Sequence, residues 1–262
     1  LLQAAYTLQE IYGQQGKKVH LLTFKDFTHD EATDISKKGF GQFYRFTTQP
    51  NMVFDIRRDW NCFDDYVASL SKKYRDQFKR AQKKLLGIEK RKMSLPEIIG
   101  HSDTIYDLYE HVARNAPFNT FFLARNHFES LKANLQDDFL FYGYFCDGKL
   151  IGFNTLIKNG NALDTYFLGY DESVQREKML YLNMLYDMIA YAINQGFERI
   201  VFARTALEIK SSVGAQPVEM TGFMRHSNAL INKKLHKVFD YLEPKVEWQQ
   251  RHPFKEVEME TV

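Results

Sequence analysis

One short segment carries four polar side chains that could do chemistry together: Arg204, Thr205, Glu208 and Lys210. It follows the apolar run Arg199–Phe202, which predicts a buried strand, and Thr205 is a suitable N-cap for a helix over Ala206–Val213. The two cations could hold an anion, helped by the helix N-terminus. Glu208 could act as a base or orient Lys210. A helix cap with a solvated charged face is the alternative.

A second pair of candidates alternates along the predicted strand Ala162–Leu168. Asp164 and Tyr166 are two residues apart, so their side chains share one face of the strand. A carboxylate in an apolar strand costs free energy unless it is paired or used. We therefore predict Asp164 as a base, with Tyr166 or Tyr181 as proton donor, and a structural aspartate as the alternative. Asn154 could line the same site.

The longest predicted helix, Phe63–Leu86, has two contrasting sides. At about 100° per residue, its apolar residues fall on one stripe and its many cations lie away from it. The basic side of Lys72–Lys84 could contact tRNA, a nucleotide-linked precursor or an anionic membrane surface, with Tyr74 and Arg75 as substrate contacts. The alternative is a solvated helix face with Tyr74 in the core.

Composition limits the possible functions. The 262 residues carry a net charge of +2, so an anion-binding function needs a local basic patch. The two cysteines, Cys62 and Cys146, predict free thiols in a reducing cytoplasm, and the histidines lack metal-ligand spacing. Of these histidines only His226, beside Arg225, is a candidate for a test, whereas His20 is predicted to pack in a strand. No apolar run approaches the roughly 20 residues of a membrane helix.

The chain shows an internal repeat in the order helix, glycine, strand, helix, glycine, strand. Gly16 and Gly39 in the first copy correspond to Gly196 and Gly214 in the second. A three-stranded meander with Asp-Gly and Asn-Gly turns is predicted before the second copy.

The predicted elements of the first copy are a helix over Leu1–Tyr12, a strand over Val19–Phe24, a helix over His29–Lys38 capped by Thr28, and strands over Phe43–Phe46 and Met52–Ile56 separated by a turn at Pro50. The meander strands are Phe139–Cys146, Lys149–Lys158 and Ala162–Leu168. Two further helices are predicted over Asp103–Asn115 and Asn126–Leu135.

Two phrases, SLSKKYRDQFKRAQKK from Ser69 and ARTALEIKSSVGAQPV from Ala203, together with the central hairpin, resemble FemAB-like acyltransferases. These are tandem-GNAT proteins associated with peptidoglycan biosynthesis, and the resemblance runs from about Leu1 to about Asn228. It implies an α/β fold with a GNAT-like mixed sheet flanked by helices, in tandem halves of which the first is incomplete. The implied divisions are residues 1–60 for part of the first half, 61–135 for a helical connection with the basic helix, 136–240 for the second half and 241–262 for a charged tail.

The resemblance also implies a mechanism. An acyl donor would lie in an opening between the strand ending near Leu168 and the strand Arg199–Phe202, where backbone N–H groups polarise its carbonyl. An amine would then attack directly, with Asp164, Tyr166 and Glu208 handling protons. Donor contacts would come from Gln175, Arg176, Arg204, Thr205 and Lys210, and substrate contacts from Asn154, Tyr74 and Arg75. The donor expected first is acyl-CoA, with no metal.

One stretch departs from ordinary GNAT enzymes. Tyr170–Leu180 contains no glycine, whereas the usual loop that binds the CoA pyrophosphate is Gln/Arg-x-x-Gly-x-Gly/Ala. Two alternatives therefore stay open: an aminoacyl-tRNA-dependent N-aminoacyltransferase acting on a peptidoglycan precursor or a peptide, and a non-catalytic module that binds RNA or an anionic surface. An aromatic loop with Phe118, Phe121 and Phe122 is predicted to form an acceptor lid or to cap the core.

Overall fold

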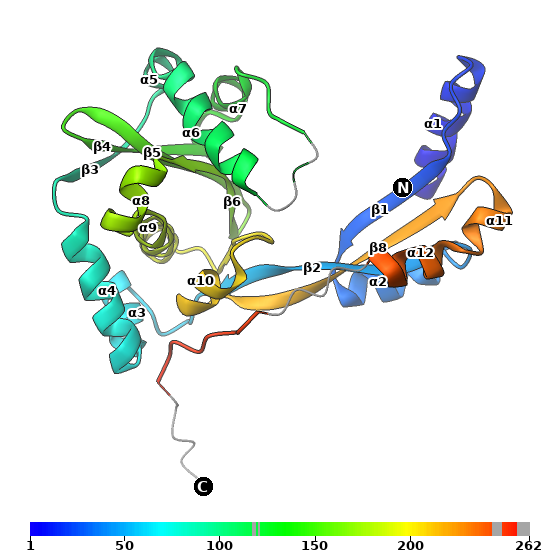
Figure 1. The fold of residues 1–262 in the computed structure, drawn as a ribbon. Coiled ribbons are helices and arrows are strands. Elements are labelled where there is room, and N and C mark those ends of the chain that lie inside the picture. The colour runs from blue at the N-terminus through cyan, green and yellow to red at the C-terminus, as the bar shows by residue number, and fades with distance from the viewer. Residues whose placement is uncertain (117–118, 120, 243–247, 256–262) are drawn as a thin grey trace, which may run out of the picture. The chain divides into compact units, whose positions relative to one another are not determined.

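The computed structural model describes residues 1–116, 119, 121–242 and 248–255, and they form two compact units (Figure 1). Unit 1 comprises Leu1–Asn51 with Pro217–Trp248, and unit 2 comprises Met52–Gln216 with Gln249–Val262. The two units are defined by contacts within the chain, whereas the predicted boundaries at residues 60, 135 and 240 separate halves of related fold. Those boundaries stay a prediction.

Unit 2 is built on a mixed sheet in the strand order β2-β7-β6-β5-β4-β3. Strands β4, β5 and β6 form the predicted antiparallel meander. Asp147 and Gly148 both have positive φ, as a two-residue hairpin turn requires. The strands are β2 (Tyr44–Asp55), β3 (Ile88–Lys92), β4 (Phe139–Cys146), β5 (Lys149–Asn159), β6 (Ala162–Tyr170) and β7 (Arg199–Val201).

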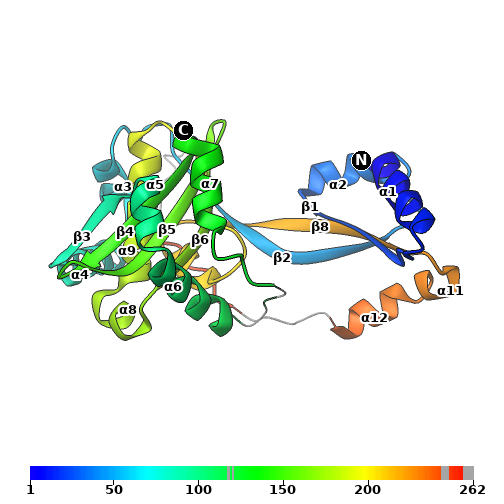
Figure 2. The same cartoon turned by 90° about the horizontal axis from the view of Figure 1, so that it is seen from above.

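Helices cover both faces of this sheet, and Figure 2 shows α5, α6 and α7 on one face and α9 on the other. The glycines on the strands allow close packing: a Cβ on Gly169 would meet the α6 backbone at 2.7 Å, and one on Gly152 would meet Leu180 and Met184 of α9 at 2.9 Å. The helices are α5 (Leu95–Gly100), α6 (Ser102–Asn115), α7 (His127–Leu135), α8 (Glu172–Lys178), α9 (Leu180–Asn194) and α10 (Leu207–Ser212), with a 3-10 turn at Gln136–Asp138.

Unit 1 has the strand order β1-β8-β2 and a separate aromatic core. Ala32, Phe40, Phe43 and Phe223 are buried together there. As predicted, Thr28 caps a helix, and its hydroxyl and the Glu31 carboxylate form a reciprocal capping box. The elements are α1 (Leu2–Gln14), β1 (Leu21–Phe27), α2 (His29–Ser36), β8 (Gln216–His226), α11 (Ala229–Asn232) and α12 (Leu235–Leu242).

The element order confirms the repeated pattern, because α1-β1-α2-β2 and α9-β7-α10-β8 have the same series. The four glycines at matching positions have φ between +74° and +111°, the left-handed region that glycine favours. In unit 1, β1 pairs antiparallel with β8, and in unit 2, β7 pairs antiparallel with β2. The first strand of each copy therefore pairs with the second strand of the other copy.

The predicted helix Phe63–Leu86 is wrong, because the chain forms two helices, α3 (Phe63–Ser69) and α4 (Lys72–Lys84). Leu70 between them is extended and bridges to Phe254. The Ser71 N–H donates to the Pro253 carbonyl at 2.8 Å, and the Lys255 N–H donates to the Ser69 carbonyl at 3.1 Å. Pairing with residues more than 180 positions away therefore interrupts a sequence that is helical by local pattern.

Two other local predictions are corrected. The two strands predicted around Pro50 are a single strand, β2, whose partner after Met52 is β7. His20 is exposed and precedes β1, so it is not a packed strand residue. Neither β3 nor α5 is predicted, because β3 is a basic edge strand and α5 has only six residues.

Candidate active site at the divergence of strands β6 and β7

Strands β6 and β7 of unit 2 pair in parallel over three residues and then stop pairing. The pairs are Ala162 with Arg199, Leu163 with Ile200, and Asp164 with Val201. Strand β7 ends there, whereas β6 continues to Tyr170. This is the place where the sequence predicts an opening between the two strands.

A bulge in β6 lies directly beyond the last of these pairs. Asn154 opposes Leu168 and Leu156 opposes Thr165, so β6 has one residue more than β5 between them. Tyr166 and Phe167 occupy the bulge, and the Phe167 carbonyl accepts a hydrogen bond from the Thr155 hydroxyl at 2.6 Å. A bulge of this kind bends the strand and re-aims a side chain.

The re-aimed side chain of Tyr166 reaches His127, the first residue of α7. Its hydroxyl lies 3.0 Å from His127 Nε2, and the two rings stack with centroids 5.8 Å apart. Burial raises the pKa of Tyr166 and lowers the pKa of His127. At neutral pH the phenol therefore keeps its proton and the imidazole stays neutral, so a proton donor and a proton acceptor lie side by side. Sequence reasoning missed His127, because only the α7–β6 packing places it beside Tyr166.

Asp164 lies earlier on β6 and is hydrogen-bonded to a neighbouring side chain. Its carboxylate accepts a hydrogen bond from Asn159 Nδ2 at 3.0 Å, beside the turn between β5 and β6. Tyr166 is hydrogen-bonded to His127 and not to Asp164. The structure therefore gives Asp164 and Tyr166 separate hydrogen-bond partners, and the role of Asp164 as a base stays a prediction.

The main chain after β7 holds two residues in an unusual conformation. Ala203 and Ala206 have φ of +59° and +54°, the left-handed region that costs a non-glycine residue about 1–3 kcal/mol. Lys210 stabilises this turn, because its ammonium donates to the carbonyls of Phe202 and Ala203. The Lys210 residue is only 4% exposed, and burial lowers its pKa to about 7. The anion clamp predicted for Lys210 is therefore corrected: its amine holds the turn from within.

Thr205 and Arg204 lie on this turn. Helix α10 begins after Ala206 without a side-chain cap, so Thr205 is not the predicted N-cap. Thr205 is exposed, and Arg204 is half-buried, with its pKa lowered by burial. Both side chains therefore stay candidates for donor contacts.

Glu208 holds the C-terminal segment of unit 2. Its carboxylate accepts from the Gln249 N–H at 3.2 Å and pairs with Arg251 at 3.2 Å. These contacts lower the pKa of Glu208, with the Gln249 bond as the main cause. A carboxylate held ionised by such partners is a poor base, so the geometry does not support the predicted catalytic role.

The comparisons with known proteins identify the family and the fold. The family model FemAB-like, described as peptidoglycan biosynthesis/recognition, matches residues 5–257. The chain belongs to the FemAB-like family. It is a transferase of the acyl- or aminoacyltransferase class, and the sequence resemblance is confirmed. No match was found in the comparison with curated proteins.

Solved structures show the same fold at low sequence identity. The C-terminal domain of a putative lysylphosphatidylglycerol synthetase from Agrobacterium fabrum is 10% identical with a TM-score of 0.56, covering 90% of this chain and 77% of that one. FemX is 12% identical with a TM-score of 0.56, covering 91% and 79%. A conserved protein of unknown function from Bacteroides thetaiotaomicron is 12% identical with a TM-score of 0.60, covering 85% and 74%. The fold is a mixed α/β sheet flanked by helices, as predicted.

The segment expected to contact CoA in this FemAB-like chain is a helix. Gln175 and Arg176 lie in α8, and Arg176 Nε is 3.4 Å from the Glu172 carboxylate on the same helix. The Asp171 carboxylate caps the first turn by accepting from the Ser173 N–H at 2.9 Å. A carboxylate thus occupies the helix end where a pyrophosphate would need free N–H groups.

The three predicted substrate contacts lie elsewhere. Asn154 is 1% exposed and donates to the Tyr144 hydroxyl, which in turn donates to Asp187. These bonds make Asn154 part of a buried polar chain that ends on α9, although Asn154 Oδ1 is buried without a hydrogen-bond partner among the described residues. Tyr74 is buried, as the alternative reading holds, and Arg75 is half-buried on α4.

The basic side of α4 is an open surface. Six cations are exposed there, and none forms an ion pair with a described residue: Lys72, Lys73, Lys79, Arg80, Lys83 and Lys84. The neighbouring cations of β3 are paired, for example Lys90 with Asp187 at 3.3 Å. The α4 cations, named the α4 basic surface below, are thus available to a polyanion.

Other expected features are placed as follows. Phe121 and Phe122 are exposed and Phe118 lies outside the described residues, so the predicted lid stays a prediction. Cys62 and Cys146 are free thiols. The described residues contain no group of three or more His, Cys, Asp or Glu that could hold a metal, and none of their helices has the length and apolarity to cross a membrane.

Proposed function

We propose that this FemAB-like chain transfers an aminoacyl or acyl group from an ester or thioester donor to an amine, at the divergence of β6 and β7. The observation that carries the proposal is the Tyr166–His127 hydrogen bond of 3.0 Å at the β6 bulge, beside the last β6–β7 pair. The direct attack needs no covalent enzyme intermediate.

The chemistry follows from the protonation states of this pair. The acceptor amine attacks the donor carbonyl carbon, a C–N bond forms, and the carbonyl oxygen becomes an oxyanion that nearby N–H groups can stabilise. Neutral His127 accepts the proton that the amine loses. Tyr166 supplies a proton to the leaving oxygen or sulfur as the C–O or C–S bond breaks. The Tyr166–His127 hydrogen bond then returns the proton to the phenol.

Two observations favour aminoacyl-tRNA over acyl-CoA as the donor. The α8 segment has an internal carboxylate cap in place of a pyrophosphate loop, and the α4 basic surface offers exposed cations, which form no ion pair with a described residue, to a phosphate backbone. The family description favours a peptidoglycan precursor as the acceptor. A donor of this kind also places the reaction in the cytoplasm. Acyl-CoA stays the second donor to test.

The first experiment measures transfer of a radiolabelled amino acid from aminoacyl-tRNA to a nucleotide-linked peptidoglycan precursor, beside a parallel reaction with acetyl-CoA. Tyr166→Phe should lower the rate about 10²–10⁴-fold, the usual contribution of a general acid. Tyr12→Phe, which changes a tyrosine that is 44% exposed in unit 1, is the matched control. Transfer from acetyl-CoA alone would overturn the tRNA donor, and equal rates in Tyr166→Phe and the control would overturn the site.

The pH profile provides a second readout. Because burial lowers the His127 pKa, the rate should fall on the acid side with a midpoint pH below the ordinary histidine pKa of about 6.5. The His127→Gln variant should be slow and should lose this limb. An unchanged limb in that variant would remove His127 from the reaction.

A non-catalytic role is the second candidate, and the α4 basic surface motivates it. Lys79→Glu with Lys83→Glu should weaken tRNA binding and reduce the salt dependence by roughly 0.7–0.9 in log–log slope per lost phosphate contact. Lys37→Glu with Lys38→Glu makes the same charge change on exposed residues of unit 1 and should leave tRNA binding and its salt dependence unchanged. If Tyr166→Phe retains full cellular function while the α4 variant loses it, the chain is a binding module.

A further inference from the structure

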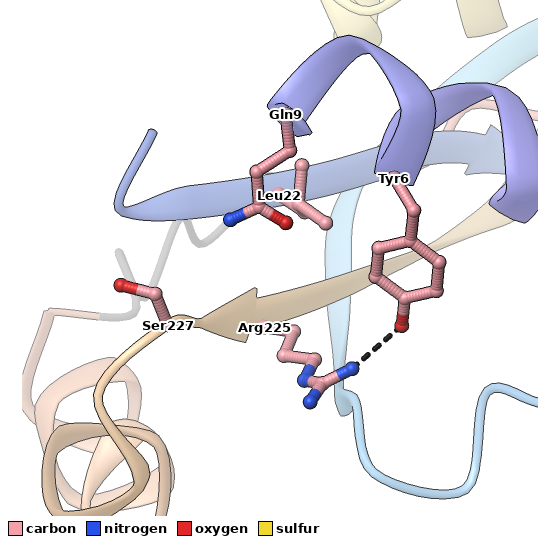
Figure 3. A pocket seen from close by; sticks show the side chains of 5 residues that line it. All are labelled: Tyr6, Gln9, Leu22, Arg225 and Ser227. Carbon is pink, nitrogen blue, oxygen red and sulfur yellow. Dashed lines mark hydrogen bonds between the residues drawn. The ribbon is translucent and has the colours of Figure 1, made fainter. Parts of the chain in front are cut away.

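Unit 1 contains a cavity that the transferase reaction does not use. It has a volume of about 190 Å³ and is lined by Tyr6, Gln9, Leu22, Arg225 and Ser227 (Figure 3). An apolar cavity of roughly 150 Å³ is large enough to bind benzene, so this one has room for a group of several heavy atoms.

The cavity forms where helix α1 crosses the end of the β1–β8 pair. Leu22 and Arg225 are opposite each other in the β1–β8 register, and Tyr6 and Gln9 come from α1. Ser227 follows two residues after Arg225. Figure 3 shows the Arg225 and Tyr6 side chains directed toward each other beneath Gln9 and Leu22. One strand pair and one helix therefore place four polar side chains around one small space.

The Arg225 guanidinium is held in position without being neutralised. It donates to the Tyr6 hydroxyl at 2.6 Å and lies 5.8 Å from the Tyr6 ring centroid and 5.9 Å from that of Phe43. None of the five lining residues is acidic, and Arg225 forms no ion pair with a described residue. A fixed guanidinium presents a planar fork of N–H donors that matches carboxylate and phosphate oxygens.

The other polar groups add acceptors and hydroxyl donors around this cation. Gln9 is fixed, because its Nε2 donates to the Val19 carbonyl at 3.0 Å. Tyr6 accepts from Arg225, so its own O–H remains to donate, and Ser227 contributes another hydroxyl. His20 and His226 stack at 6.0 Å next to Ser227, whose hydroxyl lies 3.5 Å from His20 Nδ1. The cavity thus combines one fixed cation, two hydroxyls and one amide, with no carboxylate among its lining residues, and the two imidazoles lie outside that lining.

We infer that this cavity binds the oxyanion of a small ligand, a carboxylate or a phosphate group, with Arg225 as the main contact and Tyr6 and Ser227 as hydroxyl donors. The inference is independent of the proposed transfer reaction, because all of its residues lie in unit 1.

The test is a titration of the full chain with acetate and, separately, with inorganic phosphate, followed by side-chain NMR of Gln9 and by calorimetry. Saturable shifts of the Gln9 amide resonances are expected. Arg225→Gln should weaken binding at least tenfold and Arg225→Lys by less, because lysine keeps the charge but loses the fork. Arg58→Gln removes the same charge from an exposed arginine of unit 2 and should leave binding unchanged.

Ser227→Ala and Tyr6→Phe keep the proposal testable if Arg225→Gln fails to fold, and each should weaken binding several-fold. Stronger binding of acetate identifies a carboxylate ligand, and stronger binding of phosphate identifies a phosphoryl ligand. The absence of a saturable shift with either probe, or equal losses in Arg225→Gln and Arg58→Gln, would overturn the inference. Activity of unit 2 would not be affected by either result.

Discussion

The two copies of the helix–strand–helix–strand pattern have one topology but bury their side chains very differently. In α9 of the second copy, ten of the fifteen residues are buried, whereas α1 of the first copy has none. The reason lies in their surroundings, because α9 packs on a sheet that includes the meander and α3 and α4 pack on α9 in turn. An identical order of elements therefore does not imply an equal share of the core.

The second helices of the copies differ in a related way. Helix α2 begins at a Thr28 capping box, whereas α10 begins after a left-handed Ala206 with no side-chain cap. In its place, the buried Lys210 binds the carbonyls ahead of the helix. The first copy uses the more stable start, and the second copy keeps a strained turn beside the candidate active site. Strain of this kind is common at functional sites.

The largest difference is expected from matched truncations in α9 and α1. Ile189 is fully buried, so Ile189→Ala should lower the free energy of unfolding of unit 2 by about 2–5 kcal/mol. Ile11 is 43% exposed, and Ile11→Ala should change the free energy of unfolding of unit 1 by less than about 0.5 kcal/mol. Urea unfolding, with hydrogen exchange to separate the units, measures both. Equal effects would show that the two helices contribute alike.

The effect expected from Lys210 is smaller when it is counted per pH unit. Its pKa falls from 10.5 to about 7 in the folded chain, so between these values the unfolded state binds more protons than the folded state. Lys210 should therefore make unit 2 more stable as pH rises through that window, by up to about 1.4 kcal/mol per pH unit. Lys210→Met should abolish this slope and disturb the Ala203–Ala206 turn. A slope that persists in Lys210→Met would contradict the assignment.

The smallest effect is expected from the two threonines that precede α2 and α10. Thr28→Ala removes a hydroxyl that accepts a hydrogen bond from the Glu31 N–H, and it should lower the free energy of unfolding by about 1 kcal/mol. Thr205→Ala removes no cap and should lower the free energy of unfolding by less than about 0.5 kcal/mol. Thermal unfolding of the two variants measures the difference. A larger loss from Thr205→Ala would mean that Thr205 stabilises the turn in solution.

Much of the fold could be predicted from local patterns. The helices predicted over Asp103–Asn115 and Asn126–Leu135 correspond to α6 and α7, and the three predicted meander strands correspond to β4, β5 and β6. The Asp147-Gly148 pair predicted the first meander turn, and Thr28 predicted the start of α2. These features succeed because helix periodicity, left-handed turns and caps depend on residues within a few positions of one another.

The candidate site depended on contacts that no local pattern contains. The sequence singled out Tyr166, but its partner His127 is 39 positions away and comes from a different helix. Lys210 was predicted to hold an anion together with Arg204, yet the turn after β7 buries it. The helix break at Leu70 likewise required the segment around Phe254. The sequence alone determined the family, the order of elements and the residue types near the site. Only the tertiary structure decided which of those residues meet, because burial and pairing arise between segments far apart in the chain.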